Sequence, residues 1–343
     1  MTSFFLAGAE QQLRDHPLIK MKGLIDWESI RTSLRGIYRR DESNGGGPEP
    51  YDSIMMFRLM LLGQWHHLSD VELEHALSVR IDFLLFCGFD MGEPLPDSTT
   101  ICRFRNRLAK NQLDQKLLRQ INGQLEQLGL KVKGTRGAII DATIITSAGR
   151  PRNTIEATKD GEIDDISRSA DSEARWTKKG NEAFFGYRGF MAVDTEDGYV
   201  EAVRMTPANA AEVSNLEPLL DRIPEAALDA VFADKGYHSQ ANRDRLKARG
   251  IKDGLQHKAA RSHPLKPWQK EINSVIALIR YKVERGFGTM KRKFGLSRAR
   301  YFGVRKTEAQ MAYAAINLNL LKAANKLQAI TATPPRLLQP SCA

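Results

Sequence analysis

Cysteine is scarce in this chain, which has only three among its 343 residues. Cys87, Cys102 and Cys342 lie far apart and form no Cys-X-X-Cys pair, which argues against a disulfide framework or a zinc site and is typical of a reducing compartment. Long apolar runs are missing too, because Arg58 interrupts the longest candidate, around Ile54–Leu62. The start of the chain has no basic segment before its short apolar run, so we expect no signal peptide and no membrane span. The sequence therefore predicts a cytoplasmic protein.

Several catalytic motifs are also absent. The chain contains no Gly-X-X-X-X-Gly-Lys-Ser/Thr phosphate loop, no His-Glu-X-X-His zinc motif and no Gly-X-Ser-X-Gly nucleophile turn. His66 and His67 are adjacent and therefore lack the spacing of metal ligands, and the other histidines are scattered. These absences disfavour P-loop nucleotide hydrolysis, zinc proteolysis and serine hydrolysis.

Positive charge, in contrast, is abundant. The chain has 51 Lys and Arg against 41 Asp and Glu, a formal net charge of +10. This balance favours a polyanionic partner, either nucleic acid or an acidic membrane surface. On charge alone, a basic soluble protein without such a partner is an equally good interpretation. A hydrophobic content of 42% is enough to bury a core, and the length allows roughly two domains.

The first 130 residues are expected to be helical. Ser69-Asp-Val-Glu72 is a capping box, in which the serine and glutamate side chains bond each other's backbone N–H groups at a helix start. It opens a predicted helix through about Leu85. Apolar periodicity and helix-breaking residues predict further helices over residues 51–66, 99–110 and 113–128.

Arginines are concentrated on the predicted helix over residues 99–110, where we expect Arg103, Arg105 and Arg107 to lie exposed. Two helices around a Pro-Asp-Ser turn, the second rich in arginine, could form a helix-turn-helix that reads DNA. An ordinary helical bundle with a solvated basic face explains the same residues and is slightly favoured.

The pattern changes near residue 135. The run Ala138–Ile145 is apolar and β-branched, as in a buried strand. Residues 146–185 are polar and predict a mobile loop. Further strands are predicted over 186–194, 199–205, 230–234 and 253–257, and further helices over 211–222, 242–249, 268–293 and 307–327. This order predicts a mixed sheet covered by helices, an α/β (α+β) fold rather than repeated βαβ units.

Three carboxylates stand out in this second half. Asp141 lies within an apolar strand, where an ionised carboxylate is costly unless it is paired, hydrogen-bonded or bound to metal. Asp234 ends a strand, although a turn Asp that bonds its own backbone is equally plausible there. Glu284 shares one face of the long helix with Arg280 and Lys291, at i, i+4 and i+11, which alone favours a solvated ion-pair row.

Taken together, these carboxylates favour a metal site. Two strand carboxylates and one helix carboxylate can converge at one edge of a mixed sheet. Hard oxygen ligands suit Mg²⁺ or Mn²⁺. Two such ions can activate the attacking oxygen and stabilise the leaving oxygen when a phosphodiester bond is displaced. The sequence thus predicts a two-metal site for phosphodiester chemistry.

A basic and aromatic segment follows Glu284. Between residues 285 and 306 there is no acid, and four aromatic side chains are interleaved with the basic ones. The basic residues are Arg285, Lys291, Arg292, Lys293, Arg298, Arg300, Arg305 and Lys306. The segment favours a DNA track with stacking groups over a solvated basic face, since no acids balance the charge. Gly286 and Gly288 within a helix indicate close packing or close approach of the backbone to DNA.

The order of these motifs resembles a known family. The stretches that carry the resemblance are Tyr51–Trp65, Leu68–Gly88, Pro96–Leu108, Ile139–Ile145, Phe185–Asp194, Phe232–Ser239 and Val283–Tyr301. Over nearly the whole chain they resemble the DDE-type transposases of bacterial insertion sequences, specifically the insertion-sequence-five group. The resemblance implies a helical DNA-end-binding and dimerisation domain at residues 1–130, an RNase H-like catalytic domain at 131–330 and a Pro-rich tail at 331–343.

The same resemblance assigns roles to residues. It makes Asp141, Asp234 and Glu284 the DDE triad, which holds two Mg²⁺ ions with Mn²⁺ as an alternative. The family signature around the glutamate also contains the arginine and lysine that correspond to Arg280 and Lys291, but Ala277 stands where the signature has tyrosine. Tyr281 is a candidate for the role of that tyrosine. The expected DNA contacts are Arg280, Lys291, Arg285, Arg292, Lys293, Arg298, Arg300, Arg103, Arg105 and Lys235.

The predicted function is therefore that of a DNA transposase. It would bind the terminal inverted repeats of its own element as a homodimer or higher oligomer, cleave the ends, and join them to target DNA in the bacterial cytoplasm, in association with the nucleoid. A metal-dependent nuclease that cuts without strand transfer is the first alternative. A DNA-binding regulator derived from a transposase is the second, and the presence of all three carboxylates argues against it.

Overall fold

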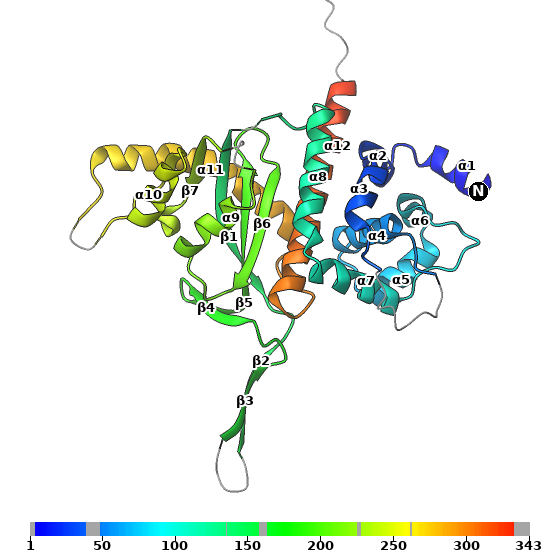
Figure 1. Cartoon of the computed structure of the whole chain (residues 1–343), viewed down its shortest axis with the longest axis horizontal. Helices are drawn as coiled ribbons and strands as arrows, with labels where there is room; N and C mark the ends of the chain where they lie inside the picture. The colour runs from blue at the N-terminus through cyan, green and yellow to red at the C-terminus, as the bar shows by residue number, and fades with distance from the viewer. Residues whose placement is uncertain are drawn as a thin grey trace, which may run out of the picture.

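A computed structural model of the chain describes residues 4–38, 49–134, 136–157, 163–224, 228–260 and 263–332 (Figure 1). A group of N-terminal helices lies on one side of the molecule and a mixed sheet on the other, with the long helices α8 and α12 between them. Residues 333–343, which make up most of the Pro-rich tail predicted at 331–343, lie outside the described residues.

The N-terminal part is helical, as predicted. Its helices are α1 (Phe4–Gln12), α2 (Pro17–Leu24), α3 (Trp27–Leu34), α4 (Ser53–Trp65), α5 (Asp70–Val79), α6 (Ile81–Cys87), α7 (Ser98–Lys110) and α8 (Leu113–Gln127). The capping box is confirmed, since Glu72 N–H donates to Ser69 Oγ and Ser69 N–H donates to Glu72 Oε2. The prediction of one continuous helix from this capping box to Leu85 is wrong. Arg80 has an extended backbone and ends α5, so the chain changes direction and α6 buries Phe83 and its neighbours.

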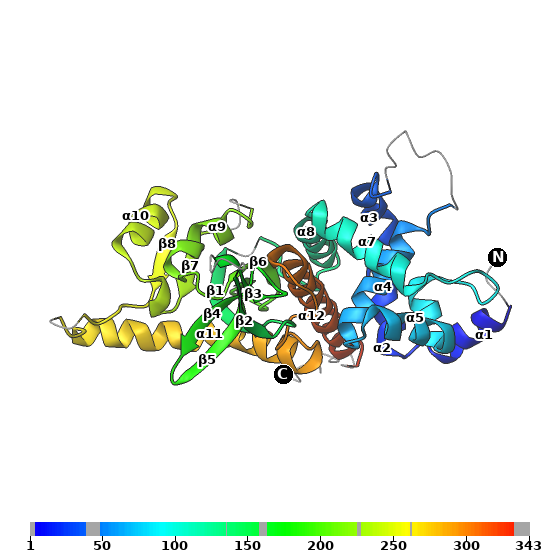
Figure 2. The same cartoon turned by 90° about the horizontal axis from the view of Figure 1, so that it is seen from below.

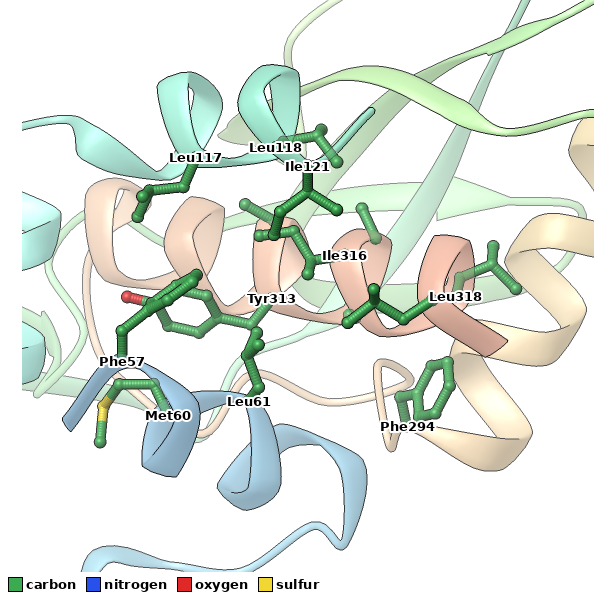
Figure 3. Close-up of a cluster of buried hydrophobic side chains, with 14 of the residues drawn as sticks. Phe57, Met60, Leu61, Leu117, Leu118, Ile121, Phe294, Tyr313, Ile316 and Leu318 are labelled. Carbon is green, nitrogen blue, oxygen red and sulfur yellow. The ribbon is translucent and has the colours of Figure 1, made fainter. Parts of the chain in front are cut away.

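The C-terminal helix α12 (Val304–Ala332) is the centre of the helical part. Every residue from Thr307 to Leu320 is buried, because this segment is rich in alanine and leucine and has neighbours on all sides. Figure 3 shows Tyr313 and Ile316 of α12 between side chains of α4 and α8. The hydrophobic core is therefore continuous across residue 130, and the division of the chain at that position stays a prediction.

Five strands of the six-stranded sheet follow in the order β6-β5-β1-β7-β8, and β4 (Arg175–Lys179) pairs with β5 as the sixth. The five are β1 (Gly137–Thr146), β5 (Glu182–Asp194), β6 (Val200–Pro207), β7 (Ala230–Ala233) and β8 (Lys252–Leu255). The first three pair antiparallel, whereas β7 is parallel to both β1 and β8. This order and these directions are those of the RNase H-like fold, so the predicted fold class is confirmed.

The prediction of a structureless loop over residues 146–185 is wrong. Strands β2 (Pro151–Ala157) and β3 (Ile163–Ser169) form a hairpin that projects from the body, and β4 (Arg175–Lys179) pairs with the first part of β5 (Figure 1). The sequence of these strands is polar and charged, so it lacks the apolar alternation from which strands are predicted.

Helices cover both faces of the sheet. On one face, Ile140 packs with Leu219 of α9 (Leu216–Leu220) and Leu246 of α10 (Gln240–Ala248). On the other, Ile139 belongs to the core cluster that includes Val283 of α11 (Pro267–Lys293). Successive side chains of β1 point to opposite faces of the sheet, so they contribute to two separate cores. Figure 2 shows α11 running along the sheet and projecting past the strands at its N-terminal end.

Candidate active site

Asp141 and Asp234 come from neighbouring parallel strands at the same level. The parallel register of β1 and β7 ends with Ile140 opposite Ala233, and each aspartate is the next residue along its strand. The Asp141 carboxylate accepts a hydrogen bond from the backbone N–H of Ala142 at 2.9 Å. The Asp234 carboxylate accepts one from the backbone N–H of Gly236 at 2.8 Å, and caps the short turn Lys235–Tyr237. The strand register therefore brings the two predicted aspartates together.

Glu284 reaches the same edge from α11, together with Arg280 one turn earlier. Arg280 Nη2 lies 3.1 Å from Asp141 Oδ2 and 3.7 Å from Glu284 Oε1. The side chains of Arg280 and Asp141 are only 12% and 17% exposed, whereas that of Glu284 is 59% exposed. Because Arg280 contacts a strand carboxylate as well as its helix neighbour, its side chain is part of the site and not of a solvated row on α11.

The electrostatics of the site favour a cation. Burial raises the pKa of the Asp141 carboxyl, and the nearby Asp234 and Glu284 carboxylates raise it further, while Arg280 opposes the shift. Three mutually repelling oxygen donors are the chemistry that hard divalent ions neutralise. Within the described ranges, however, no three His, Cys, Asp or Glu side chains are arranged to enclose one ion. Arg280 supplies the positive charge beside Asp141 and Glu284 in this arrangement.

Lys291 of α11 and Lys179 of β4 influence one another electrostatically. Burial lowers the pKa of Lys291, and the neighbouring charge of Lys179 lowers it further. Lys179 belongs to β4, which the sequence did not predict, so its position could not be anticipated. Both charges are positive, so an anion near them would relieve this repulsion.

Arg285 and Tyr281 lie on a different side of α11 from Arg280. Both line a groove of about 430 Å³ between α11, α12 and the turn that joins β5 to β6, together with Lys282, Lys322 and Lys326. Ala277, the position where the family signature has tyrosine, is itself exposed, and Tyr281 lies one turn after it on α11. The replacement of that tyrosine by Tyr281 stays a prediction. Gly286 is buried, and a Cβ there would lie 3.0 Å from Met191 Cε, so close packing explains this glycine.

The remaining expected DNA contacts include both exposed and buried side chains. Those with exposed side chains are Arg103, Lys235, Arg292, Lys293 and Arg298. The expectation that Arg105 is exposed is wrong, since it is 5% exposed, pairs with Asp70 and lies 3.9 Å over the ring of Tyr301. Arg300 donates to the backbone oxygens of Gly63 and Leu68, at 2.9 and 2.6 Å. These two arginines hold the C-terminal segment against the helical part.

Glu212 is a site residue that the sequence did not indicate. It lies in the segment between β6 and α9, inside the range 211–222 for which a helix is predicted, and no strand end or charged motif marks it. Burial raises the pKa of its carboxyl, as does the nearby Asp234, and Arg188 opposes the shift. Only the fold brings Glu212 beside an aspartate that is 22 positions later in the chain.

Comparison with known proteins identifies the family of the chain. Residues 133–320, more than half of the chain, match the family model of the transposase DDE domain. The chain belongs to the DDE transposase family. Residues 7–107 of the transposase match a second model, described as a transposase domain of the DUF772 family. The chain is 44% identical over 229 residues to the transposase for insertion sequence element IS1106 of Neisseria meningitidis serogroup B. The matched region covers 66% of this chain and 78% of that protein.

Solved structures give a weaker comparison. A Mos1 mariner paired end complex with Mn covers 81% of this transposase and 87% of its own chain, at 12% identity and a TM-score of 0.21. A Mos1 strand transfer complex covers 83% and 81%, at 13% identity and a TM-score of 0.20. These TM-scores are too low to support an argument about the site.

Family membership establishes the class of reaction. The protein is a DNA transposase, an enzyme that binds, cleaves and transfers DNA and uses a divalent metal ion. Asp141, Asp234 and Glu284 all fall within the matched catalytic domain, as does Arg280. Among the residues that the structure describes, no helix is long and apolar enough to cross a membrane.

Proposed function

We propose that Asp141, Asp234 and Glu284 are the catalytic carboxylates of this transposase. The observation that carries the proposal is the position of Arg280, whose guanidinium contacts Asp141 from β1 and Glu284 from α11. A single buried cation that reaches both carboxylates requires that strand and helix deliver them to one place. Asp234 joins them through the register of β1 and β7.

The donor set of these residues fits Mg²⁺, with Mn²⁺ as an alternative. All three side chains offer hard oxygen ligands, and their mutual repulsion favours a divalent cation between them. Two bound ions would neutralise charge on the attacking and leaving oxygens of the phosphodiester. Asp141 and Asp234 are set by the strands of the sheet, whereas Glu284 is more exposed and would be accessible to DNA.

The cations of the chain would position the DNA. When DNA is bound, Arg280 and Lys291 would hold phosphate groups next to the scissile bond, since both lie on the α11 face of Glu284. Lys179 would add a third contact from β4. Exposed basic residues at the end of α11 and after it, namely Arg292, Lys293 and Arg298, would continue the track. Lys235, Arg103 and the groove residue Arg285 are more distant candidates.

The proposed substrates are the terminal inverted repeats of the element that encodes the chain, followed by target DNA. Joining two ends requires that both be held at once, so we propose a homodimer or higher oligomer on DNA, acting in the bacterial cytoplasm at the nucleoid. Membership of the insertion-sequence-five group is part of the same proposal. No step needs a covalent protein–DNA intermediate.

A cleavage and joining assay tests the proposal. The purified chain is incubated with a labelled element end, a target plasmid and Mg²⁺, and cut and joined products are separated. We expect Glu284→Gln to lose both products and keep end binding. Glu271→Gln is the matched control, because Glu271 is an exposed acid on the same helix. Full activity of Glu284→Gln would exclude the proposed triad.

The same assay separates the alternatives. Cut ends without joined product would identify a nuclease that lacks strand transfer. Tight binding of element ends by the unmodified chain, without any cutting, would identify a DNA-binding regulator. The filled positions of all three carboxylates support the transposase over the regulator.

A further inference from the structure

Glu212 lies against the backbone that follows Asp234. A Cβ atom placed on Gly236 would lie 1.9 Å from Glu212 Oε2 and 2.9 Å from Asp234 Oδ1. The two carboxylates therefore occupy the space beside this glycine that a Cβ atom would take. Asp234 also accepts the Gly236 N–H, so its orientation depends on the backbone that Glu212 contacts.

Arg188 holds Glu212 in this position. Arg188 Nη1 lies 3.0 Å from Glu212 Oε1, and Arg188 Nη2 donates to Thr177 Oγ1 at 3.3 Å. Arg188 lies on β5, opposite Ile144 of β1, so its anchor is the same sheet that holds Asp141. The ion pair is largely buried, which strengthens it and limits the positions of both side chains.

The residue after Gly236, Tyr237, carries a buried hydroxyl. Tyr237 is fully buried, and its hydroxyl has no hydrogen-bond partner among the residues that the structure describes. Burial raises the pKa of this phenol, and the charges of Asp141, Glu212 and Asp234 raise it further. A buried polar group without a partner indicates that a water or ligand oxygen belongs there.

We propose that Glu212 is a positioning residue for the metal-binding carboxylates of this transposase, acting through Asp234 while Arg188 anchors it. The proposal rests on the assignment of Asp141, Asp234 and Glu284 as the catalytic carboxylates. Glu212 fixes the backbone at Gly236, and thereby Asp234, and its charge increases the attraction for a divalent cation. Residues that orient metal ligands in this way commonly change metal affinity by about 10–100-fold when altered.

Direct binding of Mn²⁺ to the full chain without DNA is the test, measured by electron paramagnetic resonance or calorimetry. We expect Glu212→Gln, which keeps the shape and removes the charge, to weaken Mn²⁺ binding about tenfold or more. The matched control is Glu201→Gln on β6. Glu201 is also a largely buried glutamate in an ion pair, with Lys131 at 2.8 Å, but it faces α8. We expect this control to lose stability and to bind Mn²⁺ as the unmodified chain does.

A second pair of variants tests whether Arg188 acts on Mn²⁺ binding through Glu212. Arg188→Gln should weaken Mn²⁺ binding as well, and the double variant Arg188→Gln/Glu212→Gln should be no weaker than Glu212→Gln alone. Additive losses would overturn the role of Arg188 as an anchor. In the cleavage assay, Glu212→Gln should raise the metal concentration that gives half of the maximal rate. As a fold-change, its effect on the rate at saturating metal should be smaller.

The outcomes distinguish this proposal from the triad on which it rests. If Asp141→Asn and Asp234→Asn abolish Mn²⁺ binding while Glu212→Gln binds normally, the role of Glu212 is excluded and the triad stands. If none of the three variants changes Mn²⁺ binding, the triad itself is wrong. Should Glu212→Gln be unstable, Glu212→Asp serves instead. It keeps the charge but withdraws the carboxylate from Gly236, and normal Mn²⁺ affinity in that variant would equally exclude the proposal.

Discussion

Arg280 Nη2 lies 3.1 Å from Asp141 Oδ2, and this pair links the long helix α11 to the central strand of the sheet. Both side chains are largely buried, so neither charge is well hydrated. An ion pair of this kind loses much solvation free energy when it forms, and removal of one partner leaves the other charge without compensation. Arg280 therefore stabilises the carboxylates when no metal ion does so.

We expect Arg280→Gln to lower the free energy of unfolding of the metal-free protein by about 1–3 kcal/mol, because Asp141 would lose its buried cation. Added Mn²⁺ should raise the melting temperature of this variant more than that of the unmodified chain, since the ion would replace the lost charge. Thermal unfolding with and without Mn²⁺ measures both effects. Arg285→Gln, at an exposed position on the same helix, is the control. Equal metal-free stability of Arg280→Gln and the unmodified chain would contradict the prediction.

Gly236→Ala should disturb the space beside Glu212 and Asp234 without straining the backbone. A methyl group at this position would overlap Glu212 Oε2, which Arg188 prevents from moving away freely. We expect a loss of about 1–3 kcal/mol in stability, as is usual for overpacking, and weaker Mn²⁺ binding. Gly288→Ala is the contrasting variant, since its nearest neighbour is Arg292 Nη2 at 3.7 Å and alanine favours a helix. If the two variants behaved alike in stability and Mn²⁺ binding, Glu212 would not limit the space at Gly236.

The catalytic half of the fold could largely be predicted because its signals are local. The run around Asp141 is apolar and β-branched, Asp234 ends a short apolar strand, and Glu284 lies on a helix with clear periodicity. Each signal depends on neighbours within a few positions along the chain, which is the range that sequence patterns report. Convergence of the three at one edge then followed from the order of strands and helices.

Other features depend on partners far apart in the sequence. Arg105 lies on the apolar face of α7, between Ile101 and Leu108, but a charged residue is normally expected on the solvent face. Its partners Asp70 and Tyr301 come from α5 and from the segment after α11, which the pattern of α7 does not report. The position of Glu212 beside Asp234 likewise depends on how the segment between β6 and α9 packs against the sheet. Polar residues signal neither burial nor pairing by themselves, so tertiary contacts alone determine these positions.

Arg105 should therefore behave as a structural residue. We expect Arg105→Gln to lower the free energy of unfolding by about 3 kcal/mol, because it would leave Asp70 unpaired and remove the contact with the ring of Tyr301. Arg103→Gln should change stability by less than about 0.5 kcal/mol, as is usual for an exposed residue. Chemical denaturation gives both values. A selective loss of DNA binding in Arg105→Gln, with unchanged stability, would restore the interpretation of Arg105 as a DNA contact.

His66 should make the helical part sensitive to mild acid. Burial lowers its pKa to about 4, and the charge of Arg80 contributes to the shift, whereas an unfolded histidine has a pKa of about 6.5. The unfolded chain therefore binds the proton more readily between these values. The free energy of unfolding should fall as the pH falls through this window, by at most about 1.4 kcal/mol per pH unit from this group.

His66→Phe should remove that contribution, since phenylalanine cannot titrate and the histidine ring already packs 4.9 Å from the ring of Phe83. Denaturation curves between pH 4 and 7 measure the difference in slope between the variant and the unmodified chain, so contributions from other groups cancel. His75→Gln, at an exposed position on α5, should leave the slope unchanged. If the slope of His66→Phe matched that of the unmodified chain, His66 would have the same pKa in the folded and unfolded states. An interaction that stabilises the charged imidazolium would then have to offset the cost of its burial.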